Sequence, residues 1–183
     1  MPSVQYDMEV NQILFEALRR LMQTIPIDSL SVKDIIQCAG VSRATFYRHF
    51  KDKYDLMNQS YESILEQTLY KFYEGMKWKE AASLIYYAIK KDLSFFQNAL
   101  TSSDANSLKN YIYKISMDLY IYTLEKNGEN IEDWRTINLL KIWIYGSLEL
   151  TTIWIQNGMK EPIDEMMEIV KIGMPLRFSR YFD

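Results

Sequence analysis

The side chains best suited to a recognition chemistry lie in residues 40–53, which read Gly-Val-Ser-Arg-Ala-Thr-Phe-Tyr-Arg-His-Phe-Lys-Asp-Lys. Four of these residues are basic and one is acidic, although the whole chain has a net charge of −3. Arginine and lysine bind phosphates, and arginine can also donate two parallel hydrogen bonds to a guanine edge. The stretch is therefore a candidate for contact with nucleic acid.

The spacing of the apolar residues divides this stretch into an inner and an outer face. Ser42 is a good N-cap for a short helix. Within that helix Phe46 and Phe50 lie four residues apart, so both should pack inward on the same side. The residues between them should then face outward.

The outward residues have the chemistry needed to recognise DNA. We expect Arg43 to reach a guanine edge and the methyl groups of Ala44 and Thr45 to contact thymine. The expected phosphate contacts are Tyr47, His49 and Lys53, and Arg48 is either a phosphate contact or a surface residue.

The segments before this helix are expected to position it. Apolar residues recur at helical spacing over residues 8–24, and Pro26 ends that pattern. Ser31 precedes Asp34 by three residues, as in a capping box, so a second helix should begin after Ser31. Gly40 falls where that helix must end, because glycine adopts a left-handed conformation without steric cost. Two helices joined by a tight turn are typical of a helix-turn-helix.

The rest of the chain predicts an all-α fold. With 48% hydrophobic residues, 6 Gly and 4 Pro, the composition is typical of a well-buried helical protein. A fourth helix is expected from about Asp52 to Gly75, a rod of roughly 35 Å that connects two domains. One interrupted or two consecutive helices are expected over residues 78–100, followed by helices at 107–126, 132–156 and 163–172 and a tail at 176–183.

The charge is unevenly distributed along the chain. Residues 1–53 contain seven basic and six acidic residues, which leaves fourteen basic and eighteen acidic residues in the remainder. A short cationic face suffices to bind phosphates, while an acidic remainder discourages indiscriminate binding. We therefore expect a helix-turn-helix DNA-binding domain at 1–53 and a C-terminal helical regulatory and dimerisation domain at 54–183.

The sequence gives little support for a catalytic site, a metal site or a membrane-spanning segment. Cys38 is the only cysteine and is expected to be a small buried or half-buried filler, and His49 is the only histidine. A metal site or a Ser-His-Asp triad is therefore not expected, nor is a cofactor. The sequence shows no signal peptide, and its most apolar run, residues 142–148, is too short to cross a bilayer. We expect a cytoplasmic protein.

Two further sites are expected in the C-terminal part. Aromatic residues there could line an effector cavity, although core packing explains them equally well. The candidates are Tyr86, Phe95, Phe96, Tyr111, Trp143 and Tyr145. The last two helices carry more apolar surface than one small domain needs, and this favours a dimer interface. Its candidate residues are Gly146, Ser147, Leu150, Trp154, Met166 and Val170.

Residues 10–57 resemble the N-terminal domain of TetR-type transcriptional regulators. The matching groups are residues 31–35, 39–42, 45–50 and 53–56. The resemblance implies a homodimer that binds a palindromic operator through two helix-turn-helix units, with a C-terminal domain for dimerisation and often for a small effector. Residues 95–96, 144–147 and 154–158 resemble the branch that includes the activator of dihydroxyacetone kinase operons, except that Ser147 replaces a second glycine after Gly146. Some members of this branch sense a protein partner.

One alternative remains open from the sequence. The protein could be a coregulator that acts mainly through protein–protein contacts of its C-terminal domain. An enzyme is not expected, because the helical domain lacks a nucleophile–base pair, a metal cluster and a phosphate-binding glycine loop.

Overall fold

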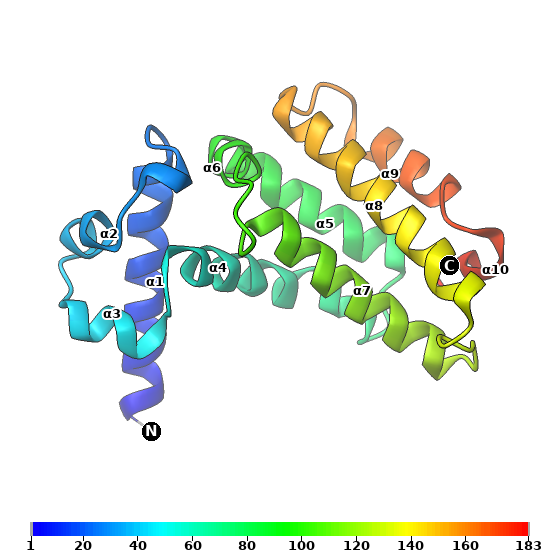
Figure 1. Cartoon of the computed structure of the whole chain (residues 1–183), viewed down its shortest axis with the longest axis horizontal. Helices are drawn as coiled ribbons and strands as arrows, with labels where there is room; N and C mark the ends of the chain where they lie inside the picture. The colour runs from blue at the N-terminus through cyan, green and yellow to red at the C-terminus, as the bar shows by residue number, and fades with distance from the viewer. Residues whose placement is uncertain (1, 183) are drawn as a thin grey trace. The chain divides into compact units, whose positions relative to one another are not determined.

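The computed structural model describes residues 2–182, and the side chains of residues 6–182. In that part of the chain all regular elements are helices, which confirms the predicted all-α fold (Figure 1). The elements are α1 (Pro2–Met22), η1 (Ile27–Ser29), α2 (Val32–Ala39), α3 (Arg43–His49), α4 (Lys53–Gln67), η2 (Leu69–Phe72), α5 (Trp78–Lys91), α6 (Leu93–Ala99), α7 (Leu108–Lys126), α8 (Trp134–Gln156), α9 (Ile163–Ile172) and α10 (Leu176–Ser179). None of these helices is long and apolar enough to span a membrane.

The chain folds into two compact units, each built from more than one stretch of sequence. The first unit comprises the chain up to Ser63 together with residues 94–108, and the second comprises residues 64–93 and the chain from Lys109 onward. The first unit therefore differs from the expected domain at 1–53. It is larger because most of α4, up to Ser63, and nearly all of α6 belong to it.

The core of the first unit joins four helices. Phe46 from α3 and Phe50 after it are fully buried, and the Phe50 ring lies 5.8 Å from the ring of Phe15 on α1. Tyr61 from α4 and Phe96 from α6 are also buried, with their ring centroids 6.3 Å apart. The first contact holds the end of α3 against α1, and the second joins α4 to α6.

The fourth helix is shorter than the sequence predicts. We expected it to continue to Gly75, but α4 ends at Gln67 and a short 3-10 helix, η2, follows. At Thr68 the backbone leaves the helical region, with φ −131° and ψ −90°, and the hydroxyl donates a 2.6 Å hydrogen bond to the carbonyl of Ile64. A threonine hydroxyl that bonds the carbonyl four residues earlier competes with the helical ladder. The apolar pattern continues past the break because Leu69 is itself buried.

The core of the second unit is aromatic. The indole nitrogen of Trp78 donates to the hydroxyl of Tyr120 at 3.1 Å, and that of Trp143 donates to the carbonyl of Val170 at 3.0 Å. The second bond joins α8 to α9, which lie side by side in Figure 1. Phe182 is buried at the end of the described chain and stacks on Phe72 with ring centroids 5.8 Å apart. Trp78 and Trp143 therefore each have a partner for the N–H group, whereas the indole nitrogen of the buried Trp154 has none in the described part of the chain.

Candidate nucleic-acid interface

The helix-turn-helix is built by local hydrogen bonds. Ser31 and Asp34 form a capping box at the start of α2, as the sequence predicts. Gly40 has φ 68° and ψ 25°, a left-handed conformation that glycine tolerates without strain. Val41 then donates its N–H to the carbonyl of Ile36 at 3.2 Å, and Ser42 caps α3 by accepting from the N–H of Thr45 at 3.0 Å. The turn therefore fixes the direction in which α3 leaves α2.

The outer face of α3 carries most of the predicted contact residues. Arg43, Ala44, Tyr47 and Arg48 are exposed to solvent, opposite the buried Phe46. The guanidinium carbon of Arg43 lies 5.4 Å from the centre of the Tyr47 ring, one helical turn away. These two side chains thus lie together on the exposed face of α3, and both carry hydrogen-bond donors.

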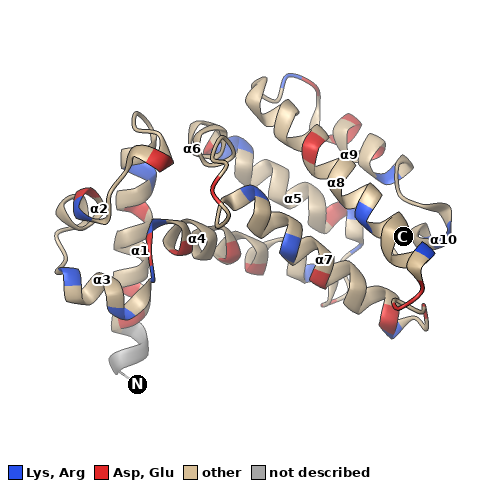
Figure 2. Cartoon of the chain, in the orientation of Figure 1, with Lys and Arg blue, Asp and Glu red and all other residues tan. Residues whose placement is uncertain are grey.

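The charges around α3 favour a polyanion. Figure 2 shows basic residues along α2, α3 and the segment that leads into α4. Lys33, Arg43, Arg48 and Lys51 are exposed there. The neighbouring carboxylates bond to backbone N–H groups at helix starts. Asp34 caps α2, and Asp52 accepts from the N–H groups of Tyr54 and Asp55 at 2.8 and 2.9 Å. The exposed cations therefore outnumber the exposed carboxylates around α3, of which Asp7 is one.

Three predicted contact residues are less available than the others. The hydroxyl of Thr45 is 2.8 Å from that of Ser42, within the cap of α3. The side chain of His49 is only 7% exposed, and its Nε2 lies 3.5 Å from the carboxylate of Asp7. The ammonium of Lys53 donates to the carbonyls of Asp28 and Leu30 at 2.8 and 2.9 Å. Lys53 therefore ties the start of α4 to the segment that precedes α2.

The segment between α1 and α2 has further partners that the sequence did not indicate. Asp28 accepts hydrogen bonds from the hydroxyls of Tyr54 at 2.8 Å and Ser102 at 2.6 Å. Those bonds, Ser102 first, lower the pKa of the Asp28 carboxyl. Asn98 on α6 bonds to three backbone groups of the same segment. No local pattern could reveal these contacts, because their partners lie 26 to 76 residues away along the chain.

Cys38 differs from the expectation for it. We expected a buried or half-buried filler, but Cys38 is exposed on α2. Ile35 is the buried residue of this short helix, whereas Cys38, three positions later, is exposed. In the described part of the chain no group of three or more potential ligands could hold a metal ion.

The six candidates for an effector cavity are divided between the two units. Phe95 and Phe96 belong to the core of the first unit, whereas the other four lie in the second. Tyr86 bonds to Thr151 at 3.2 Å, Trp143 is buried against Tyr120, Tyr111 is half-buried, and Tyr145 is exposed and stacks on Tyr113. A hollow of about 550 Å³ lies elsewhere in the second unit. It is lined by Lys77, Lys79, Glu80, Ser83, Leu84, Tyr87, Asp164, Lys171 and Phe182.

The six candidates for a dimer interface divide into two groups. Trp154, Met166 and Val170 are 3%, 5% and 6% exposed, because they belong to the core of the second unit. Gly146, Ser147 and Leu150 lie at the surface of α8. Other large apolar side chains on α8 and α9 are exposed. They include Ile142 (70%), Tyr145 and Ile153 on α8, and Ile169 and Ile172 (75%) on α9.

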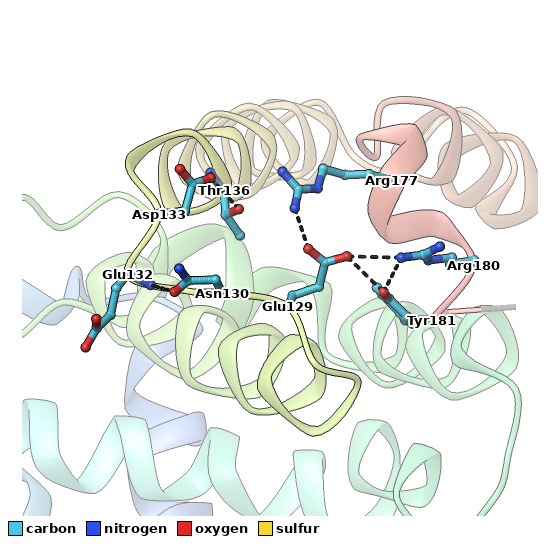
Figure 3. Close-up of polar contacts among 8 residues, drawn as sticks. All are labelled: Glu129, Asn130, Glu132, Asp133, Thr136, Arg177, Arg180 and Tyr181. Atoms are coloured by element: carbon cyan, nitrogen blue, oxygen red, sulfur yellow. Dashed lines mark hydrogen bonds and ion pairs between the residues drawn. The ribbon is translucent and has the colours of Figure 1, made fainter.

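A polar cluster fixes the end of the described chain to the second unit. Figure 3 shows Glu129, in the loop before α8, facing Arg177, Arg180 and Tyr181. The carboxylate accepts from the Tyr181 hydroxyl at 2.8 Å and from Arg180 at 3.2 Å, and it forms an ion pair with Arg177. The bonds from Tyr181 and then Arg177 lower the pKa of the Glu129 carboxyl. This cluster holds the chain immediately before the buried Phe182.

Comparison with protein families gives matches over most of the chain. A family described as "Transcriptional regulator C-terminal region" matches residues 76–174, which is more than half of the sequence. A second family, described as "Bacterial regulatory proteins, tetR family", matches residues 14–59. The second match contains α2, α3 and the turn between them.

Individual relatives and solved structures agree with these matches. The HTH-type dhaKLM operon transcriptional activator DhaS of Lactococcus lactis subsp. lactis (strain IL1403) is 26% identical over 86 residues, which is 47% of this chain and 46% of that protein. The match therefore spans about half of the relative. The structure of the dihydroxyacetone kinase operon activator DhaS has a TM-score of 0.62 with 18% identity, over 95% of this chain and 98% of that one. The fatty acid degradation regulator FadR from Bacillus halodurans has a TM-score of 0.57 with 16% identity, over 92% and 96%. At these identities the structures establish a shared fold.

Proposed function

The chain belongs to the TetR family of transcriptional regulators, and we propose that it binds a palindromic DNA operator as a homodimer. In this proposal α3 lies in the major groove, and the second unit forms the dimer and modulates the affinity for DNA. The chain has a regulatory role and performs no catalytic step.

The exposed face of α3 is the observation that supports this proposal most directly. Arg43 has the donors for a guanine edge, and the methyl group of Ala44 suits a thymine methyl. Tyr47, Arg48, Lys51 and Lys33 surround these residues and can hold phosphates. Thr45 and His49 have smaller exposed surfaces and so contribute less.

A homodimer is supported by the apolar surface of α8 and α9. Ile142, Gly146, Leu150 and Ile153 recur at spacings of four, four and three residues, which places them on one face of α8. Gly146 leaves open space where a side chain would stand, so a second helix could approach closely there. Monomeric proteins rarely expose a contiguous apolar patch of this kind. A second copy of the same face is the partner that closed symmetry provides.

The hollow beside α5 and α9 supports the proposal that the second unit modulates the affinity for DNA. Its walls combine apolar side chains, such as Leu84 and Phe182, with three lysines and two carboxylates. A small effector that binds there should raise the melting temperature of the protein and change its affinity for DNA. Thermal-shift screening of metabolites, followed by duplex binding with each hit, tests this part of the proposal.

A selection from random duplexes with purified full-length protein tests the DNA-binding role. We expect the retained sequences to contain a palindrome whose half-sites are separated by about 34 Å or a multiple of that distance. The double variant Arg43→Ala/Tyr47→Ala should lose this preference while keeping its fold. If the wild-type protein retains no duplex but forms a stable complex with another protein, the coregulator alternative is correct instead.

A further inference from the structure

One side chain of α6, Asn98, makes three hydrogen bonds to the backbone of the segment between α1 and α2, and Ser94 of the same helix donates to the side chain of Gln23. The amide nitrogen of Asn98 donates to the carbonyls of Met22 at 2.8 Å and Ile25 at 2.7 Å. Its amide oxygen accepts from the N–H of Ile27 at 2.9 Å. Asn98 is half-buried, and these bonds use both of its donors and its acceptor.

These bonds leave little freedom to the backbone that leads into the helix-turn-helix. Residues 22–27 have no complete helical ladder of their own, because Pro26 interrupts it. An unsatisfied backbone group at a half-buried position would be costly, so the chain keeps the geometry in which Asn98 satisfies three of them. Ile27 is fully buried, and Ser31, the cap of α2, follows only four residues later.

A second tie comes from the loop after α6. Ser102 is buried, and its hydroxyl donates to the carboxylate of Asp28 at 2.6 Å while it accepts from the N–H of Asp104 at 3.2 Å. The same carboxylate accepts from Tyr54 on α4. Asn98 and Ser102 therefore both fix the segment before α2 to residues 94–108.

We propose that Asn98, with Ser102 as a second tie, is a positioning residue for operator binding. It sets the orientation of α2 and α3 relative to α6, and it would not itself touch DNA. Residues 94–108 join the second unit through the chain at both ends, so a change in that unit can reach α3 through this segment. The inference rests on the proposed function, because it assumes that α3 binds DNA.

The test compares variants on the duplex that the wild-type protein selects and on two altered duplexes. The altered duplexes carry one base pair more or one fewer at the centre of the palindrome, a change of about 3.4 Å between half-sites. Asn98→Ala should lower the affinity for the selected duplex about tenfold. It should lower the affinity for the altered duplexes less, because freed recognition helices adjust to the changed spacing. A purely structural role would reduce stability and leave the ratio between duplexes unchanged.

The matched control is Asn127→Ala in the second unit. Asn127 also donates from its amide to a backbone carbonyl, that of Thr123 at 2.8 Å, but it makes no contact with the segment before α2. We expect this variant to keep the wild-type affinity for the selected duplex. The ratio of its affinities for the selected and the altered duplexes should also remain that of the wild type. All variants are measured well below their melting temperatures, which are determined by circular dichroism.

Each outcome decides the inference. The inference is overturned if Asn98→Ala folds and keeps both the wild-type affinity for the selected duplex and the wild-type ratio of affinities between selected and altered duplexes. If Asn98→Ala does not fold, Ser102→Ala is judged by the same ratio, with a smaller change of about two- to threefold expected and no change overturning the inference. If the wild-type protein binds no duplex at all, the proposed function fails first and the inference fails with it.

Discussion

At the scale of single residues, Lys53 could have either of two roles. A basic side chain near DNA can bind a phosphate, or it can stabilise the protein by bonding to other parts of the chain. The Lys53 ammonium donates to the carbonyls of Asp28 and Leu30, and it lies 5.1 Å from the centre of the Tyr54 ring. A lysine in this setting stabilises the protein whether or not DNA is present. The sequence alone suggested a phosphate contact, and that prediction remains to be tested.

Replacing Lys53 with methionine should distinguish the two roles. Methionine keeps much of the apolar stem but removes the ammonium. If Lys53 mainly holds the protein together, Lys53→Met should lower the melting temperature by about 2–4 °C and leave the salt dependence of DNA binding unchanged. Loss of a phosphate contact would instead reduce the slope of log affinity against log salt by about 1. Lys51→Met is the matched control, because Lys51 is exposed and should change the slope alone.

Arg43 should carry sequence preference through the geometry of its side chain as well as its charge. Lysine keeps the charge but cannot donate the same two parallel bonds to guanine. Arg43→Lys should therefore cost about 1–3 kcal/mol at one base position and leave the salt slope unchanged. Arg48→Lys, also exposed on α3, should cost much less if Arg48 contacts only phosphate. Equal base preferences in the two variants would contradict this assignment, as measured by competition between duplexes that differ at single positions.

The residues that the sequence placed correctly are those whose environment is set by near neighbours. Ser31 and Ser42 are caps, Gly40 is left-handed, and Phe46 is buried, all from patterns within a few positions. The roles of Asn98 and Lys53 could not be predicted, because their partners lie 23 to 76 residues away. Cys38 was placed wrongly because a helix of eight residues has few buried positions and Ile35 takes the central one.

At the scale of elements, periodicity located the helices but could not show where one of them breaks. Apolar spacing continues from α4 into η2, since both bury apolar residues, so the pattern alone predicts one long helix. The break at Thr68 depends on a side-chain bond to Ile64 and on burial of the residues that follow. The boundary between the two units, at Ser63, falls close to this break.

The C-terminal segment is an element whose attachment should depend on pH. The pKa of Glu129 is lowered from the ordinary value of 4.5 by bonds from Tyr181 and Arg177. The ionised carboxylate therefore stabilises the folded state, fully above pH 4.5, and this contribution is lost as the pH falls through the lowered pKa. We expect Glu129→Gln to melt about 2–4 °C below the wild type at pH 7. The difference should shrink toward zero below pH 4.5.

Thermal melts of both proteins from pH 3 to pH 7 provide the measurement. Glu132→Gln is the matched control, because the side chain of Glu132 points away from the cluster in Figure 3. A difference between Glu129→Gln and wild type that stays constant over this range would show that the charge of Glu129 does not stabilise the segment.

At the scale of the whole molecule, the distribution of charge and of apolar surface assigns separate tasks to separate parts. Four exposed cations, Lys33, Arg43, Arg48 and Lys51, lie on and around α3, although the chain as a whole is acidic. The exposed apolar side chains gather on α8 and α9. Binding to a palindrome uses both, because two weakly bound half-sites give a tight complex only when they are linked.

A charge placed in the apolar face of α8 should prevent dimerisation without changing the contacts of α3 with DNA. Ile142 is 70% exposed, so Ile142→Lys should leave the fold of one chain intact but place a cation in the proposed interface. We expect sedimentation at micromolar concentration to show a dimer for the wild type and a monomer for the variant. Ile13→Lys, which changes an exposed isoleucine on α1, is the matched control and should remain dimeric.

Loss of the dimer should weaken DNA binding without altering the contacts of α3. A monomer covers one half-site, so the Ile142→Lys variant should bind the full palindrome at least a hundredfold more weakly, the lower end of the usual gain from linkage. Its base preference within one half-site should remain that of the wild type, because Arg43 and Tyr47 are unchanged. A variant that stays dimeric, or a monomer that binds the palindrome as tightly as the wild type, would show that this face does not link the two half-site contacts.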